Sequence, residues 1–499
     1  MDFWLHDCIK FINGIMWNYV LIYLLLGAGL FFTLRFGFLQ IRLLPHSIRM
    51  LWHNNGGGIT PFQAFAIGVA SRVGTGNIAG VAVALTVGGS GAIFWMWATA
   101  FLGMSSSFVE ATLAQIFKVK NPDGTYRGGP AYYISAGLKS RFFSIAFALS
   151  LILAFGFVFN AVQASSIADA LGETFNFPRS STGMLLVLIA APILFGGIKR
   201  VAKISQFMVP IMAIAYLLLA FWVIIQNKSA LIPIILDIIN NAFGLKQAAG
   251  GLIGAAVSQA LMVGIKRGLF SNEAGMGSAP NAAAAATTKH PVTQGLLQML
   301  GVFVDTIIIC TATALVILLS GAYVPGAAME GAALTQRAFA NAVGDWGSLF
   351  MSAAIFLFAF SSIIGNYAYA ESNVGFIFKT KNIITIFRLL VLGMIFFGTI
   401  GNLPLIWDMA DTSMAFMAII NLVAIVLLSK YVVAAWRDYS KQRQMKVNEP
   451  VFARNTIPEL APLIAKGVWD NQAESKVSVH HSDNQKDNIE EPVLRPHSN

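Results

Sequence analysis

Charged residues are scarce in this chain of 499 residues. They make up 11% of the sequence, whereas a soluble globular protein usually carries about 25%. Such a chain cannot cover a water-facing surface with charge, and 56% of its residues are hydrophobic. The composition therefore excludes an ordinary soluble domain and favours a protein that is surrounded by the lipid bilayer.

Cysteine is almost absent as well. Cys8 and Cys310 are far apart, which excludes a disulfide framework or a cysteine-based zinc site. The seven histidines lie in the predicted loops and termini, and neither HExxH nor GxSxG occurs, so we expect no enzyme and no cofactor. The net charge of +10 comes from Lys and Arg in short loops and in the tail. This distribution is typical of membrane topology and gives no reason to expect a nucleic-acid partner.

What the chain does contain is a series of long apolar runs. A membrane-spanning helix needs about 20 mostly apolar residues. Eleven runs meet this need: 15–34, 62–86, 91–117, 142–170, 182–198, 205–226, 249–286, 292–320, 347–376, 383–400 and 404–430. The sequence therefore predicts an all-α polytopic membrane protein with about eleven transmembrane helices.

The loops predict the orientation. With the N-terminus outside, the inward-facing connections hold most of the Lys and Arg, as the positive-inside rule requires. We expect a multi-pass protein of the bacterial plasma (inner) membrane whose C-terminus is cytoplasmic. Residues 431–499 are predicted to form a cytoplasmic polar tail that is largely disordered.

Two of the runs are interrupted in their middle. The second reads FQAFAIGVASRVGTGNIAGVAVALTVGG and the seventh SQALMVGIKRGLFSNEAGMGSAPNAAAAA, each with glycines, small polar residues and a charge. Irregular backbone at membrane depth is tolerated only where protein or a cavity satisfies it. The two broken helices are five spans apart, and an odd repeat makes the halves inverted, as in transporters with a midplane site.

This symmetry predicts a 5+5 inverted repeat with one extra helix in front. The expected organisation is an N-terminal segment with the extra helix and a cytoplasmic loop, a first repeat, an external connection, a second repeat and the tail. Their ranges are 1–61, 62–226, 227–248, 249–430 and 431–499.

The first break offers groups that suit an ion or a carboxylate. Freed amides at Thr75 and Gly76 could bind an anionic group, and the freed carbonyls and the Asn77 side chain offer oxygen ligands for a small cation. Ser361 and Ser362 add two adjacent hydroxyls in the ninth run.

Structural interpretations compete with these assignments. Gly76 and Gly80 also form a small-xxx-small packing motif, and serine hydroxyls in helices commonly bond back to their own carbonyls. Gln163 could join two helices. For the charges of the broken helices, Arg72, Arg267 and Glu273, a structural network is the favoured interpretation.

Three stretches resemble one known family. The stretch GGSGAIFWMWATAFLG at 88–103 closely resembles the signature of the alanine or glycine:cation symporter family, and GTGNIAGVA at 74–82 and GLFSNEAGMGSAP at 268–280 resemble two further hallmarks. The resemblance covers about residues 15–430. It implies the amino acid–polyamine–cation superfamily, the leucine-transporter-like 5+5 fold and import of alanine or glycine with sodium, or in some members with protons.

The leucine-transporter fold, compared position by position, implies two sets of site residues. The substrate-binding set is Thr75, Gly76, Asn77, Gln163, Phe270, Ser271 and Asn272. The sodium-binding set is Ala70, Val73, Asn77, Phe358, Ser361 and Ser362. Arg72 and Gln163 depart from that fold's pattern, since Arg72 replaces a small residue and Gln163 replaces a Tyr.

The resulting hypothesis is a sodium-coupled symporter that imports a small neutral amino acid by alternating access. Its partners are the amino acid, the sodium ion as coupling ion and the bilayer. Proton coupling is the alternative if one of the acidic residues in or near the spans faces the cavity unpaired: Glu110, Asp305, Glu371, Asp408 or Asp411. An ion channel is a weaker alternative, because two broken helices in inverted positions favour a carrier.

Overall fold

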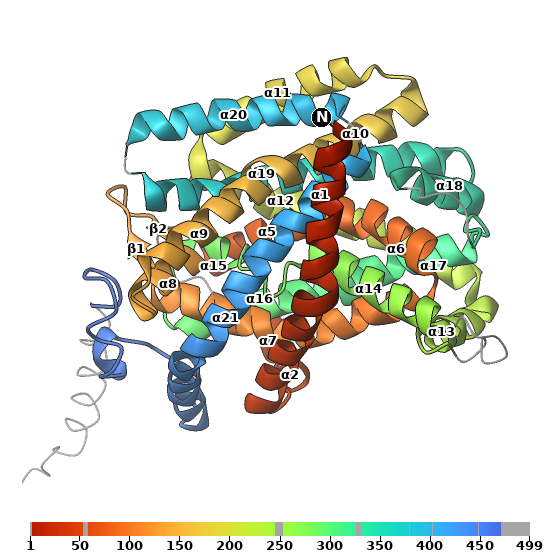
Figure 1. Ribbon diagram of the computed structural model, residues 1–499. Coiled ribbons are helices and arrows are strands. Elements are labelled where there is room, and N and C mark those ends of the chain that lie inside the picture. The colour runs from red at the N-terminus through yellow and green to blue at the C-terminus, as the bar shows by residue number, and fades with distance from the viewer. Residues whose placement is uncertain are drawn as a thin grey trace, which may run out of the picture.

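The computed structural model describes residues 2–52, 58–244, 253–325, 331–378, 380–401, 403–447 and 449–470. Helices dominate this part of the chain (Figure 1). The sheet described in it is a hairpin of β1 (Val119–Lys120) and β2 (Tyr126–Arg127), which pair antiparallel. The prediction of an all-α protein is therefore confirmed.

The N-terminal part forms one long helix that changes winding in the middle. It consists of α1 (Asp2–Ile15), the π-helical turn η1 (Met16–Leu21) and α2 (Ile22–Arg35). The short helices α3 (Leu39–Arg42) and α4 (Leu44–Met50) follow. The apolar stretch Phe11–Arg35 is long enough to cross a membrane, as expected for the extra helix.

The first predicted repeat begins with the broken helix, and its helices follow in the expected order. Their bounds are α5 (Pro61–Arg72), η2 (Gly76–Gly80), α6 (Val81–Gly88), α7 (Gly91–Ile116), α8 (Pro130–Gly137), α9 (Arg141–Leu151), η3 (Ile152–Val158), α10 (Phe159–Phe175), α11 (Arg179–Phe195) and α12 (Gly197–Gln226), and the predicted external connection 227–248 contains a further helix, α13 (Lys228–Ala242). The halves of the first broken helix, residues 61–72 and 76–88, meet at an angle of 49°.

The second predicted repeat contains a further series of helices. Its elements are α14 (Ile253–Asn272), α15 (Pro280–Ala285), α16 (Pro291–Val302), η4 (Phe303–Cys310), α17 (Thr311–Leu319), α18 (Ala332–Val343), α19 (Trp346–Ile377), α20 (Lys381–Ile400) and α21 (Leu403–Gln444), and the 3-10 turn η5 (Arg454–Thr456) lies in the predicted tail. Residues 273–279 separate α14 from α15, so the seventh run is interrupted as predicted.

Among the described residues, eight helices are long and apolar enough to span a membrane, and the bent pair brings this to nine. Large apolar side chains also cover the outside of the helix bundle. On α12 the exposed ones are Phe207, Ile211, Ile214, Leu218, Phe221, Trp222 and Ile225. An apolar surface of this kind needs lipid around it, so the protein is a polytopic membrane protein. The count of eleven spans remains a prediction.

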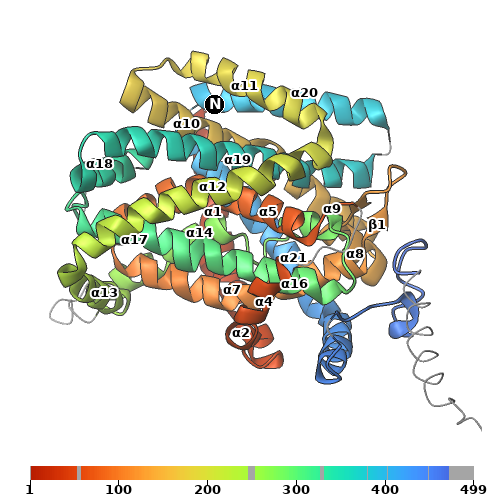
Figure 2. The same cartoon turned by 180° about the vertical axis from the view of Figure 1, so that it is seen from behind.

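Helices in equivalent positions of the two halves lie against each other. The structure packs α7 on α16, α10 on α19 and α11 on α20. Both views show α11 and α20 side by side along one edge (Figures 1 and 2). A pseudo-twofold axis relating the halves produces such pairings, which supports the predicted 5+5 repeat without establishing it.

The C-terminal region differs from its prediction. Residues 431–444 continue α21, and residues 449–470 pack against the bundle with Phe452 and Leu460 fully buried. The tail as a whole is polar in composition, but its first part contains apolar side chains that pack against the bundle. The remaining residues of the predicted tail, 471–499, lie outside the described residues.

Candidate functional site

The first break is built by local sequence. α5 starts at a capping box in which Thr60 Oγ1 accepts from the Gln63 amide at 3.1 Å and Gln63 Oε1 from the Thr60 amide at 3.0 Å. α5 ends at Arg72, where Val73 turns out of the helix with ψ 85°. A Cβ atom on Gly74 would collide with the Ser362 hydroxyl, so only glycine fits this position.

Four oxygen atoms converge beside this break. The hydroxyls of Ser361 and Ser362 lie 3.2 and 3.0 Å from the Ala70 carbonyl of α5, and 2.8 and 3.2 Å from the Phe358 carbonyl of their own helix α19. All four residues are buried, as is Val73 at the end of α5. The hydroxyls thus bond back to their own helix and also reach across to α5. The structure thus brings together four of the oxygen atoms predicted to bind sodium, those of Ala70, Phe358, Ser361 and Ser362.

The amide assigned to the substrate carboxylate already has a partner. Gln163 of α10 accepts hydrogen bonds at Oε1 from the Thr75 amide, at 3.0 Å, and from the Thr75 hydroxyl, at 2.5 Å. A neutral side-chain oxygen therefore lies where a carboxylate oxygen was expected. Gln163 does join two helices, and it does so at the predicted site.

Asn77 connects the break to a carboxylate. Its Nδ2 donates to Asp305 Oδ1 at 2.7 Å, and its Oδ1 accepts from the Gly74 amide at 2.9 Å. Ser271 donates to Asp305 Oδ2 at 2.8 Å and lies 3.2 Å from the Cys310 sulfur. Asp305 is buried within the π-helical segment η4.

Asp305 therefore belongs to the candidate site. From the sequence it stood out only as one acidic residue among several, but its position as the single charge in the run GVFVDTIIIC was a signal. π-helical segments also occur frequently at functional positions.

Aromatic rings cover this part of the site. The Phe270 ring stacks on Phe159, with 4.8 Å between centroids, and lies 4.7 Å from Trp407. A Cβ atom on Gly76 would lie 3.1 Å from Phe270 and 3.0 Å from Ser271 Cα, so Gly76 permits close approach of the two broken helices. Phe270 and Ser271 are thus next to the first break, as predicted.

Asn272, also predicted to bind the substrate, lies at the second break. Its Oδ1 accepts from the Ala274 amide at 3.0 Å, which caps the end of α14. Nδ2 of Asn272 is buried without a hydrogen-bond partner among the described residues. The described contacts assign Asn272 to the second break itself.

Carboxylates hold the second break. Glu110 of α7 accepts from the Gly275 and Gly277 amides at 3.3 and 3.2 Å, and both glycines have a φ of 84°. Glu273, itself left-handed with a φ of 57°, accepts from Ser71 and Ser278 at 2.6 Å each. The left-handed turns suit glycine, and the carboxylates satisfy the polar groups that the break frees.

The basic residues of the two breaks have separate partners. Arg72 donates to the Gln298 carbonyl at 3.1 Å and to Ser107 at 3.3 Å, between α7 and α16. Arg267 lies 2.5 Å from Asp411 on α21. The expected single network of Arg72, Arg267 and Glu273 is therefore divided, and Arg267 belongs to another one.

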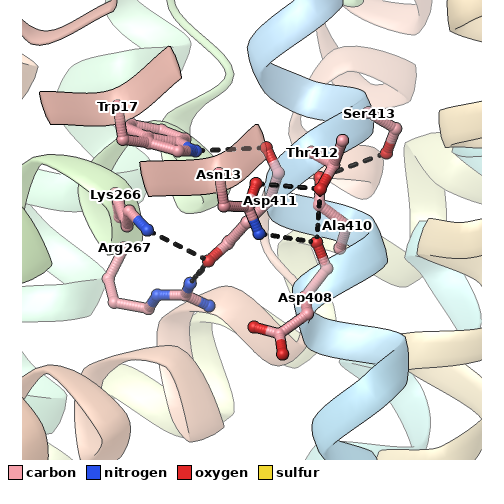
Figure 3. A network of polar contacts seen from close by, with 9 residues as sticks. All are labelled: Asn13, Trp17, Lys266, Arg267, Asp408, Ala410, Asp411, Thr412 and Ser413. Carbon is pink, nitrogen blue, oxygen red and sulfur yellow. Dashed lines mark hydrogen bonds and ion pairs between the residues drawn. The ribbon is translucent and has the colours of Figure 1, made fainter. Parts of the chain in front are cut away.

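That other network includes the first helix (Figure 3). Lys266 and Arg267 both point at the Asp411 carboxylate, at 3.8 and 2.5 Å. The Trp17 indole donates to the Asp411 carbonyl at 3.2 Å, and Asn13 donates to the Asp408 carbonyl at 3.0 Å. The extra helix is thereby fixed to α14 and α21 beside the aromatic cover.

A buried set of oxygen donors at the break of a helix, faced by a second broken helix, is typical of secondary transporters. No cluster of His, Cys, Asp and Glu side chains suited to a metal ion occurs in the part of the chain that the structure describes. The architecture thus defines the class: a membrane carrier that moves small solutes.

Comparison with known proteins identifies the family. The model of the sodium:alanine symporter family matches residues 1–454, so the chain belongs to this family. An uncharacterized transporter of Haemophilus influenzae is 52% identical over 453 residues, which cover 90% of this chain and 93% of the relative.

Two further relatives have more specific names. A probable sodium/glutamine symporter of Bacillus subtilis is 49% identical over 450 residues, covering 89% of this chain and 92% of the relative. A sodium/alanine symporter of Methanococcus maripaludis is 39% identical over 456 residues, covering 89% and 99%. The expected family is thereby confirmed.

Proposed function

We propose that this protein is a sodium-coupled symporter that imports a small neutral amino acid, alanine or glycine, by alternating access. The observation that carries the proposal is the convergence of the Ala70 and Phe358 carbonyls with the Ser361 and Ser362 hydroxyls. These oxygens come from α5 and α19, so an ion among them joins two helices. Sodium then stabilises one arrangement of the helices, which is all that coupling to a substrate requires.

The substrate site lies next to this ion site. The carboxylate of the substrate accepts hydrogen bonds from the Thr75 and Gly76 amides, and Gln163 moves from the Thr75 amide toward the substrate's ammonium group. Phe270 covers the side chain of the substrate. Gly76 and Phe270 are in close contact, which leaves little space and favours alanine or glycine.

Glutamine is a second candidate substrate. It is favoured by the name of the Bacillus subtilis relative, which is 49% identical to this chain. A longer side chain needs the Phe270 ring to move away from Phe159 and Trp407. Competition of unlabelled glutamine with labelled alanine distinguishes the two.

Proton coupling is the alternative mechanism. Asp305 is buried and bonded to Asn77 and Ser271, both from the predicted substrate set. A carboxylate in this place could carry a proton in exchange for a sodium ion. Sodium remains the proposal because the Ser361–Ser362 site consists of neutral oxygens that bind a cation without titrating.

We place the protein in the bacterial inner membrane, with the N-terminus outside and the C-terminus in the cytoplasm. The lipid bilayer is its surroundings, and no cofactor is part of the mechanism. The deciding experiment is uptake of radiolabelled alanine into proteoliposomes under an inward sodium gradient, with a proton gradient at zero sodium as the control. Uptake driven by protons alone contradicts the sodium site, and a unitary current contradicts the carrier mechanism.

A further inference from the structure

The two broken helices are joined where α5 begins and α15 has just ended. The Thr287 amide donates to the Ile59 carbonyl at 2.8 Å, and Ile59 pairs with Ala286 as a short parallel bridge. Gly58, with a φ of 72°, allows this contact, because a Cβ atom there would collide with the Thr287 hydroxyl. We call residues 58–59 and 286–287 the inner closure, since they join the start of α5 to the residues that follow α15.

The end of α7 holds the inner closure from one side. Gln115 donates to the carbonyls of Ala283 and Ala286, the latter at 3.1 Å. The Lys118 ammonium group donates to the same Ala286 carbonyl at 2.9 Å and to Gln115 Oε1 at 2.8 Å. Lys118 is buried, with 2% of its surface exposed.

Residues 449–470, here called the C-terminal cap, hold it from the other side. The Phe452 amide donates to the Lys289 carbonyl at 2.9 Å, and Glu449 forms an ion pair with Lys289. Gln442 fixes the start of the cap by exchanging two hydrogen bonds of 2.8 Å with the Val451 backbone. The stretch 286–289 is thus bonded to Ile59 at one end and to the cap at the other.

Trp469 completes the contact between the cap and Lys118. Its indole donates to the Gln115 carbonyl at 3.2 Å, and the Lys118 nitrogen lies 4.5 Å from the centroid of the Trp469 ring. Tyr126 of β2 offers a second aromatic face at 4.2 Å.

Burial lowers the pKa of Lys118 to about 7, because desolvation disfavours its charged form. The two aromatic faces and two oxygen atoms offset part of that cost. When Lys118 is charged, removal of the Trp469 ring takes away one of the contacts that offset this cost, which weakens the hold of Lys118 on the Ala286 carbonyl.

We propose that the C-terminal cap clamps the inner closure, with Lys118 and Trp469 as positioning residues of the transport cycle. Access from this side requires α5 to separate from the end of α15, and the cap restrains the residues that form that contact. The cap must loosen each time the carrier opens to this side. The proposal rests on the alternating-access function, and most of the cap lies beyond residue 454, where the match to the family model ends.

The chain contains a suitable reporter for the test. Cys310 is buried and lies 3.3 Å from Asn77 in the candidate site. In a Cys8→Ser background it is the only thiol of the chain. Its modification by a charged, membrane-impermeant thiol reagent, applied to either face of oriented membranes, measures opening toward that face without knowledge of the substrate.

We expect Trp469→Ala to raise the modification rate of Cys310 several-fold from the face that carries the cap, and to lower it from the opposite face. The matched control is Trp222→Ala, since Trp222 is exposed on α12, and its rate should equal that of the Cys8→Ser parent. Unchanged rates in Trp469→Ala, in protein that elutes as the parent does, would overturn the proposal.

A second variant tests whether Lys118 and Trp469 act together or only support the structure separately. Lys118→Met removes the buried cation, so Lys118→Met combined with Trp469→Ala should change the rate by less than the product of the single effects. Lys118→Arg should retain most of the parent's behaviour. Independent effects of the two substitutions contradict the clamp, whereas a rise from the external face alone contradicts the orientation in the proposed function and leaves the clamp intact.

Discussion

The two breaks differ in the groups that hold them. The backbone amides of the first break are bonded by neutral side-chain amides: Gln163 bonds the Thr75 amide, and Asn77 bonds the Gly74 amide. Carboxylates hold the second, where Glu110 bonds two glycine amides and Glu273 bonds two serines. A bond from an amide side chain to one residue is exchanged at modest cost, whereas a buried carboxyl group that bonds two residues at once is costly to leave unsatisfied. The first break is suited to binding and release, and the second is suited to keeping its shape.

The largest expected effect comes from filling the first break. Gly74→Ala forces a methyl group into the Ser362 hydroxyl, and overpacking of this kind costs on the order of 3 kcal/mol at its upper end. We expect alanine uptake to fall by about 100-fold. Gly80→Ala is the control, because its Cβ atom would lie 3.8 Å from its nearest neighbour. Equal losses in both variants would mean that helix packing, rather than the site, requires the glycines.

Removal of one hydroxyl tests the ion site. Ser362→Ala should raise the sodium concentration for half-maximal uptake by about tenfold, which corresponds to roughly 1.4 kcal/mol. The control is Ser352→Ala on the same helix, since the Ser352 hydroxyl bonds Gln336 and Thr174. If sodium dependence is unchanged in Ser362→Ala, the two hydroxyls only bond back to their own helix.

Gln163→Ala should weaken the binding of the substrate more than the binding of sodium. Loss of one hydrogen bond of about 1 kcal/mol predicts an increase of about fivefold in the KM for alanine. The half-saturating sodium concentration should change less. A larger effect on sodium than on alanine would assign Gln163 to the ion site.

The smallest effect on transport is expected at the second break. Glu110→Gln replaces one carboxyl oxygen that accepts from a glycine amide with an NH2 group, which cannot accept, and should lower the free energy of unfolding by about 2 kcal/mol, measured by thermal denaturation in detergent. Its half-saturating sodium concentration should stay near that of the parent. Glu173→Gln, at an exposed position, serves as the control. A shift in sodium affinity as large as that of Ser362→Ala would remove the distinction between the breaks.

Local sequence predicted the long apolar helices and both breaks, but not α13, α18 or the β1–β2 hairpin. Glycines, a charge and small polar residues within an apolar run can be recognised without knowledge of their partners, and so can adjacent serines such as Ser361 and Ser362. The partner of a buried polar group depends on helix packing instead. Neither Gln163 with Thr75 nor Arg267 with Asp411 has a signature along the chain, because 88 and 144 residues separate the pairs.

The C-terminal cap escaped prediction for a different reason. Averaged over residues 431–499, the composition is that of a solvated tail, and the apolar residues of the cap form no helical or strand period. Their burial depends on the face that the bundle offers to Phe452 and Trp469. Asp305 was visible as a charge in an apolar run, but only the π-helical segment η4 turns it toward Asn77.

The hydrogen bond between Gln163 and Thr75 affects the step in which the carrier resets without substrate. A carrier that imports solute on every cycle must reset with nothing bound, whereas an obligate exchanger resets only when loaded. If the site without substrate left a backbone amide buried and without a hydrogen-bond partner, its closure would cost free energy. Such a cost favours exchange. Here Gln163 Oε1 lies 3.0 Å from the Thr75 amide, in the position that we propose for the substrate carboxylate. The unloaded site can therefore close, and net accumulation becomes possible.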